Sequence, residues 1–226
     1  GYFGTKVYST HPQHGAHFAV LLFESSTGKP VALFEANRLG QIRTGAATGV
    51  ATDLMAARDA GSVCVIGSGF QAKTQLEAVA SVRKLNDVRV WSRHSDGREA
   101  FARGEARRLG LPVRAVDSAR EAVEGAAIVI TATYAKDPVF EFNWLAAGAH
   151  VNLIGSNNPK RREGPKELID AADVIAVDSV EQSRLESGDL LLAWSDADWA
   201  TPRLRELGAM VRDGYRRESP RATVFK

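Results

Sequence analysis

The stretch from Ser62 to Ala72, SVCVIGSGFQA, constrains the fold more than any other part of the sequence. Its first five residues are almost entirely apolar, which is typical of a strand buried on both faces of a parallel sheet. Gly67 and Gly69 then interrupt the run, and a helical pattern of apolar residues starts at Gln71. A strand, a turn with G-x-G-x-x-A spacing and a helix are together typical of a dinucleotide-binding unit.

The residue types of this turn suit a bound pyrophosphate. Gly67 permits the tight turn, Gly69 leaves the backbone free of a side chain, and Ala72 lets the helix approach the strand. Free N–H groups at the helix start can bind phosphate. We therefore expect the coenzyme to contact Gly67, Ser68, Gly69, Phe70, Gln71 and Ala72. An ordinary strand-to-helix turn is the alternative interpretation.

Strands and helices alternate through the following residues. We expect further strands at 88–91, 113–116, 127–131, 150–154 and 174–177. This alternation predicts an α/β fold, a Rossmann-type doubly wound parallel sheet with a smaller discontinuous α+β lobe. The Rossmann domain is assigned to 61–180, and a substrate and dimerisation lobe to 1–60 together with 181–226.

The pattern within that smaller lobe is mixed. We expect a strand at 4–9, a hairpin of 17–24 with 31–35, a connector at 38–43 and a helix at 44–60. Another helix is expected at 199–210, and a final strand at 222–226 is expected to pack with the first strands.

Composition excludes several classes of function. The 29 lysines and arginines nearly balance 27 acids, so neither a nucleic-acid nor a membrane-surface role is favoured. No signal peptide or membrane-spanning run is apparent. The single cysteine, Cys64, fits a reducing compartment and a cytoplasmic location. Three nearby histidines, His11, His14 and His17, have no cysteine or carboxylate among them, so no metal site is expected.

The end of the second Rossmann strand indicates which coenzyme is bound. An enzyme that prefers NAD usually carries an acid there to hold the ribose hydroxyls. Here Trp91 is followed by Ser92, Arg93 and His94. A guanidinium can face a 2′-phosphate, so we expect NADP, with NAD possible. The segment Thr131, Ala132 and Thr133 follows the fourth strand and is also expected to line the nucleotide.

With these pieces placed, the sequence resembles the ornithine cyclodeaminase/mu-crystallin family. The matching segments, in family order, are residues 4–6 (GTK), 43–47 (RTGAA), 67–72, 91–93, 131–133, 155–157 (GSN), 162–163 (RE) and 186–189 (ESGD). The resemblance implies an NAD(P)H-dependent oxidoreductase that reduces a cyclic ketimine such as pyrroline-2-carboxylate, or interconverts an amino acid with its imine or keto acid. Two alternatives stay open, which are ornithine cyclodeamination and NADPH-dependent small-molecule binding without catalysis.

The same resemblance implies roles for particular residues. Lys6 matches the family's substrate lysine, and Arg43 matches the arginine that binds the substrate carboxylate. Asn157 lies in the segment where cyclodeaminases carry an aspartate. An amide cannot take a proton from an ammonium, so Asn157 favours hydride transfer over ornithine cyclisation. Catalytic roles are therefore expected for Lys6, Arg43 and Asn157.

Family members are also usually longer. They carry a further N-terminal segment, involved in dimerisation and substrate binding, and a C-terminal tail that reaches the nicotinamide. We expect both to be absent from these 226 residues, and a homodimer to form where the N-terminal segment is present.

Overall fold

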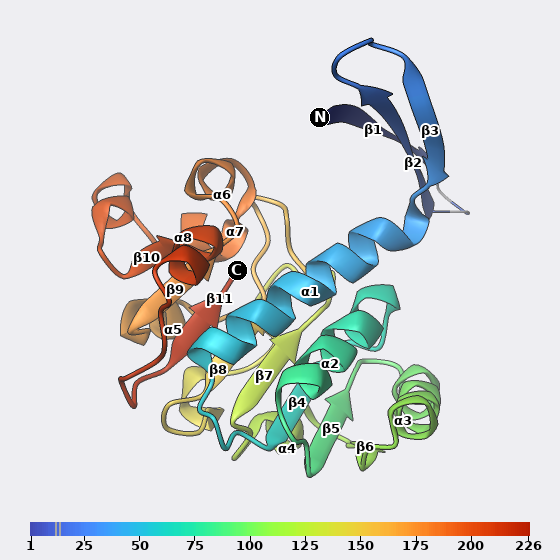
Figure 1. Cartoon of the computed structure of the whole chain (residues 1–226). Coiled ribbons are helices and arrows are strands. Elements are labelled where there is room, and N and C mark those ends of the chain that lie inside the picture. Colours follow the sequence, from blue (N-terminus) through green and yellow to red (C-terminus); the bar gives the residue numbers. More distant parts are fainter. Residues whose placement is uncertain (12, 14) are drawn as a thin grey trace. The chain divides into compact units, whose positions relative to one another are not determined.

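The computed structural model describes residues 1–11, 13 and 15–226 (Figure 1). Pro12 and His14, one of the three histidines considered as metal ligands, lie outside the described residues. The chain divides into two compact units, an N-terminal unit, Gly1–Thr44, and a larger unit, Gly45–Lys226.

The N-terminal unit contains an antiparallel sheet of three strands in the order β1-β2-β3. The strands are β1 Tyr2–His11, β2 Gly15–Glu24 and β3 Pro30–Glu35. Two aromatic pairs lie directly opposite each other on β1 and β2, Phe3 with Phe23 and Tyr8 with Phe18, at centroid distances of 5.1 and 5.3 Å. Such pairs fix the register of neighbouring strands. The predicted strand and hairpin are confirmed.

Helix α1, Asn37–Met55, includes the segment 38–43 that the sequence predicts as a connector, so that prediction is wrong. Gly40 weakens the helical pattern there, but one glycine costs only about 1 kcal/mol relative to alanine and does not end a helix. The helix also ends earlier than residue 60. The Arg83 guanidinium donates to the Thr52 carbonyl in the last turn at 2.9 Å and to the Ala56 carbonyl just past the helix at 3.0 Å.

The larger unit is built on an eight-stranded sheet in the order β10-β9-β11-β8-β7-β4-β5-β6, with every pair parallel. The strands are β4 Ser62–Ile66, β5 Asp87–Trp91, β6 Val113–Ala115, β7 Ile128–Thr131, β8 His150–Leu153, β9 Val174–Val177, β10 Leu204–Glu206 and β11 Thr223–Phe225. The helices are α2 Phe70–Val82, α3 Ser95–Leu109, α4 Ala119–Val123, α5 Lys166–Ala171, α6 Val180–Glu186, α7 Gly188–Leu191 and α8 Leu207–Arg212, with 3₁₀ turns η1 Phe142–Trp144 and η2 Asp196–Ala200.

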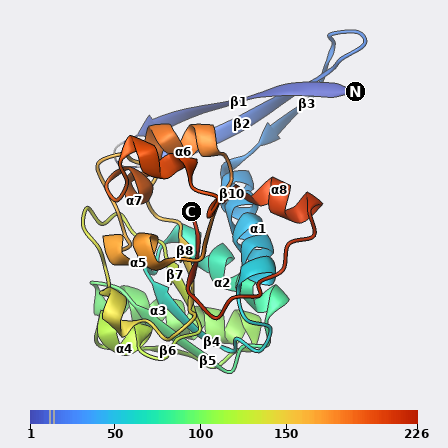
Figure 2. The same cartoon turned by 90° about the vertical axis from the view of Figure 1, so that its left-hand side faces the viewer.

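Both faces of this sheet are covered, as expected of a doubly wound fold. Val63 and Val65 of β4 pack in one cluster with residues of α2 and α3, whereas Cys64 and Ile66 pack in another with residues of α4 and α5. In Figure 2 the strands lie between α5 and α8. Alternate side chains of one strand therefore serve two cores, which explains its uninterrupted apolar run. The predicted α/β Rossmann-type fold is confirmed.

The placement of β11 differs from the expectation that residues 222–226 pack with the first strands. β11 pairs with β8 on one side and β9 on the other. The His150 Nδ1 atom lies 2.9 Å from the Thr223 Oγ1 atom, which donates to the Met55 carbonyl at 3.0 Å. Burial lowers the pKa of His150 to about 3, so this core imidazole is neutral at pH 7.

Strand β10, at the sheet edge, replaces part of the helix predicted at 199–210. β10 and β11 thus join the same parallel sheet as β4. Within the described residues, no helix combines the length and the apolar composition that crossing a membrane requires.

Candidate functional site

The turn between β4 and α2 requires glycine at its first position. Gly67 has a φ of +110°, a backbone conformation that residues with side chains rarely adopt. A Cβ atom at this position would also lie 2.4 Å from the carbonyl oxygen of Ala132, far inside van der Waals contact. Two independent constraints therefore exclude a side chain at Gly67, and the turn packs directly on the segment that follows β7.

The second glycine is free of such constraints. Gly69 has a φ of −86°, and a Cβ atom there would meet no described atom within 4 Å. Helix α2 begins at the next residue with no side-chain cap from the described residues and no acid in its first turn. A helix start without a side-chain cap is a place where anions bind in other proteins. Open space in front of Gly69 and an uncapped helix start fit a pyrophosphate.

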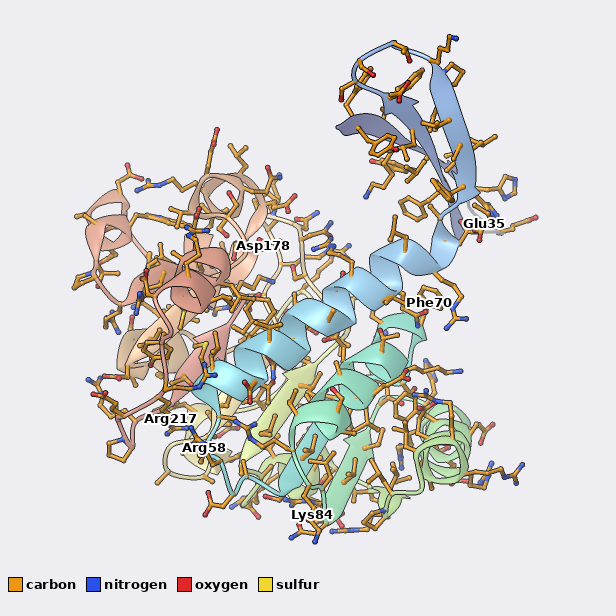
Figure 3. All side chains as sticks on the ribbon, in the orientation of Figure 1. Glu35, Arg58, Phe70, Lys84, Asp178 and Arg217 are labelled. Carbon is orange, nitrogen blue, oxygen red and sulfur yellow. The ribbon has the colours of Figure 1, made fainter. Side chains whose placement is uncertain are left out.

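Helix α2 is held close to its neighbours by small residues. Ala72 is fully buried in the core beside β4. Gly45 and Gly49 of α1 face Thr74 and Ala78 of α2 so closely that Cβ atoms would lie 2.7 and 3.3 Å from the nearest atoms. Figure 3 labels Phe70, 58% exposed, at the start of α2 and Lys84 beyond its other end. Because β4 ends at Ile66 and α2 begins at Phe70, Phe70 lies near the carboxyl end of β4.

The loop after β5 is joined to the glycine turn by two hydroxyls. The Ser68 and Ser92 Oγ atoms share a hydrogen bond at 3.0 Å. Arg98 fixes the same loop from α3, donating to the Ser92 carbonyl at 3.1 Å. Arg93 and His94 are exposed, and none of the carboxylates in the described residues pairs with Arg93. A guanidinium without an acidic partner stands where the ribose of a dinucleotide is usually held.

The segment after β7 is fixed by a buried acid. Glu163 is fully buried, and its carboxylate accepts hydrogen bonds from the hydroxyls of Thr131 at 2.8 Å and Thr133 at 2.6 Å. It also accepts from the N–H groups of Thr133 and Gly155, both at 2.6 Å. Burial raises the pKa of Glu163. The hydrogen bonds from the threonines lower the pKa, whereas the nearby charge of Asp189 raises it further.

Glu163 lies in the family-matching segment 162–163, but the residue pattern gives it no role, because its partners are Thr131, Thr133 and Gly155. A second buried acid supports it. Asp189 accepts from the N–H groups of Glu163 at 2.7 Å and Gly164 at 2.9 Å, and pairs with Lys226 at 2.9 Å. Lys226 also donates to the carbonyl of Ser156. Loops after β7, β8 and β11 are thereby tied together at the carboxyl edge of the sheet.

Strands β4 and β7 lie side by side, and the sheet continues to β5 on one side and to β8 on the other. Ligands of open α/β sheets bind at such a switch point, outside the carboxyl ends of the strands. The structure brings together here the residues predicted to contact the coenzyme, which are 67–72, 92–94 and 131–133. Asn157, exposed in the loop after β8, belongs to the same unit.

Lys6 and Arg43 belong to the N-terminal unit. Lys6 lies on β1 opposite Val20, with its Nζ atom 5.4 Å from the centroid of the Phe18 ring. Arg43 is exposed on α1. A hollow of about 450 Å³ lies in the same unit, lined by Val7, Tyr8, Ser9, His17, Phe18, Ala19, Glu35 and Asn37.

Two further features are outside the predicted site. A hollow of about 270 Å³ is lined by residues that include Arg58 and Arg217, which lie at the opposite end of the larger unit from Phe70 (Figure 3). Among the described residues, no group of three or more histidine, cysteine, aspartate or glutamate side chains could hold a metal ion.

A doubly wound parallel sheet with a glycine turn at its switch point defines a Rossmann-type protein. Comparison with known proteins gives the family: the model of the ornithine cyclodeaminase/mu-crystallin family matches residues 1–226, and the chain belongs to this family.

Three relatives illustrate the match. The Delta(1)-pyrroline-2-carboxylate reductase of Bacillus cereus (strain ZK / E33L) is 36% identical over 92% of this chain. The ketimine reductase mu-crystallin of Mus musculus is 34% identical over 95% of the chain. The chain spans 64% of the length of each. The solved structure of Thermococcus litoralis Delta(1)-pyrroline-2-carboxylate reductase, in complex with NADH and L-proline, is 34% identical with a TM-score of 0.90 and covers 99% of this chain and 72% of that one.

Proposed function

We propose that the protein is an NAD(P)H-dependent oxidoreductase that reduces a cyclic ketimine such as pyrroline-2-carboxylate, or interconverts an amino acid and its imine by hydride transfer. The observation that carries this proposal is the open space at Gly69 before an uncapped helix, in a chain of this family. A bound nicotinamide supplies the hydride. The relatives named as reductases of the same imine support the substrate class.

Arg93 supports NADP as the coenzyme. It is exposed, no described acid neutralises it, and it lies next to Ser92, which bonds to the glycine turn. A guanidinium can donate two hydrogen bonds to a phosphate, and Ser92 and His94 offer further donors. The single cysteine, Cys64, is buried, and it supports a reducing, cytoplasmic location.

Lys6, Arg43 and Asn157 are proposed to act on the substrate. The planar guanidinium of Arg43 matches a carboxylate in a two-bond arrangement, and the ammonium of Lys6 can supply a proton at the imine nitrogen. Asn157 can donate and accept hydrogen bonds but cannot serve as a base. Its amide therefore supports hydride transfer over ornithine cyclodeamination.

We expect the purified protein to oxidise NADPH, measured by absorbance, when pyrroline-2-carboxylate is added. Lys6→Ala should lower kcat/KM by about 100-fold or more, the usual contribution of a group that transfers a proton. Lys29→Ala, which changes another exposed lysine of the same unit, is the matched control and should leave turnover unchanged.

Other results would select the alternatives. Release of ammonia from ornithine without net coenzyme consumption would replace reduction by cyclodeamination. Coenzyme-dependent ligand binding without turnover of any cyclic or open-chain imine, with affinity intact in Lys6→Ala, would replace the enzyme by a binding protein.

We also propose that the N-terminal unit pairs with a second copy of the chain. Its small sheet exposes large apolar side chains that a separate unit would leave in water. They are Tyr2, Phe3, Val7, Tyr8, Val31, Leu33 and Phe34, each at least 50% exposed. Sedimentation analysis should give twice the chain mass of 24.4 kDa. Leu33→Lys should shift the mass toward the monomer, whereas Val211→Lys, at another exposed apolar residue, should not; a wild-type monomer would contradict the proposal.

A further inference from the structure

The carboxylate of Glu163 faces four donors, two of which are backbone N–H groups. Each oxygen faces one backbone N–H and one hydroxyl: Oε1 accepts from both groups of Thr133, and Oε2 from Gly155 and Thr131. Hydroxyls can rotate, but backbone N–H groups cannot. The NH₂ group of a glutamine has no lone pair to offer, so it would place a donor against one of these fixed donors.

The residues that Glu163 holds form the wall of the glycine turn. If residue 67 had a Cβ atom, it would lie 2.4 Å from the Ala132 carbonyl oxygen and 3.3 Å from the Thr133 Cγ2 atom. The Ala132 N–H donates to the Ile66 carbonyl at 2.8 Å, joining the ends of β7 and β4. A displacement of residues 131–133 would thus be transmitted directly to the turn.

The backbone of Glu163 is itself fixed. Asp189 accepts from the Glu163 N–H, and its other oxygen pairs with Lys226, whose side chain is 6% exposed. Position 155 also requires glycine, because a Cβ atom there would lie 2.2 Å from the Thr133 carbonyl oxygen. The acid therefore sits in a packed frame that leaves its carboxylate little freedom to move.

We propose that Glu163 is a positioning residue of the coenzyme site: its carboxyl group holds residues 131–133 and Gly155 so that the Gly67 turn keeps the shape that binds pyrophosphate. It acts through these segments and does not itself touch the coenzyme. The inference rests on the proposed function, because it assumes that the turn binds a nicotinamide dinucleotide.

Glu163→Gln tests the inference, with Glu105→Gln as the matched control, because Glu105 is also buried but pairs with Arg108 on α3. NADPH affinity would be measured by fluorescence titration and folding by thermal unfolding. We expect a cooperatively folded Glu163→Gln protein whose Kd for NADPH is raised about tenfold or more, the size of effect of an unsatisfied buried hydrogen-bonding group. Hydrogen exchange at the Thr133 and Gly155 amides should accelerate in this variant and not in Glu105→Gln.

If Glu163→Gln does not fold, Glu163→Asp replaces it, since it keeps the charge but is one methylene too short to reach both backbone N–H groups. It should also weaken NADPH binding, by several-fold. If Glu163→Gln or Glu163→Asp folds and binds NADPH with the wild-type Kd, the positioning role of Glu163 is overturned and the proposed function is not. A wild-type protein that binds neither coenzyme would overturn the proposed function and the inference with it.

Discussion

Replacing either glycine of the turn by alanine should abolish or greatly weaken coenzyme binding, but by two separable routes. Gly67→Ala places a Cβ atom at 2.4 Å from the Ala132 carbonyl oxygen on a backbone with φ of +110°. Strain and overpacking each cost about 1–3 kcal/mol, so we expect a loss of roughly 2–5 kcal/mol in the free energy of unfolding. Urea unfolding would measure it.

Gly69→Ala should instead leave the protein stable. Its φ of −86° suits alanine, and the new methyl group would meet no described atom within 4 Å. The free energy of unfolding should change by less than about 1 kcal/mol. The methyl group would occupy the space we assign to the pyrophosphate, so the Kd for NADPH should rise about 10- to 100-fold.

The pair of variants separates a structural glycine from a ligand-facing one. A Gly69→Ala protein with unchanged stability and unchanged coenzyme affinity would show that the pyrophosphate does not approach this turn. Equal destabilisation by both variants would show that the space before Gly69 is occupied by protein.

The second large effect is expected at Arg93, in the choice between the two coenzymes. Removing a cation that donates charge-assisted hydrogen bonds to a phosphate costs about 1.5–3 kcal/mol, or roughly 10- to 150-fold in affinity. Arg93→Ala should therefore raise the Kd for NADPH by that factor. The Kd for NADH should change little, because NADH lacks the 2′-phosphate.

Arg107→Ala is the matched control, since Arg107 is also exposed and lies on α3, the helix that follows the Arg93 loop. It should alter neither affinity. Titrations at two salt concentrations would show a stronger salt dependence for NADPH than for NADH, because exposed charges are screened. A wild-type protein that prefers NADH, or an equal loss of both coenzymes in Arg93→Ala, would contradict the assignment of Arg93 to the phosphate.

Features determined by neighbours in sequence could be predicted. The buried strands β4, β7 and β9 appear as short apolar runs, and the glycine turn is a local pattern. Strand β10 could not be found in the same way. It has three residues, two of them charged, and lies at the edge of the sheet, where one side of the strand needs no partner.

Features that depend on contacts between distant segments could not be predicted. Thr223–Phe225 resembles a strand in the sequence, but no residue in it specifies that its neighbours are β8 and β9. Of the donors that meet Glu163, those of Thr131 and Thr133 are 32 and 30 residues away in sequence, and the N–H of Gly155 reaches it only through the fold of the loop after β8. The roles of Lys6 and Arg43 came from family resemblance and stay predictions.

The position of β11 has a consequence for how the protein is made. β9 and β10 emerge from the ribosome well before β11, yet in the finished sheet only β11 connects them to β8. Until residues 223–225 are synthesised, the growing chain can assemble β4 to β8 but must keep the edges of β8 and β9 unpaired. Unpaired strand edges of this kind are open to pairing with wrong partners until β11 takes its place.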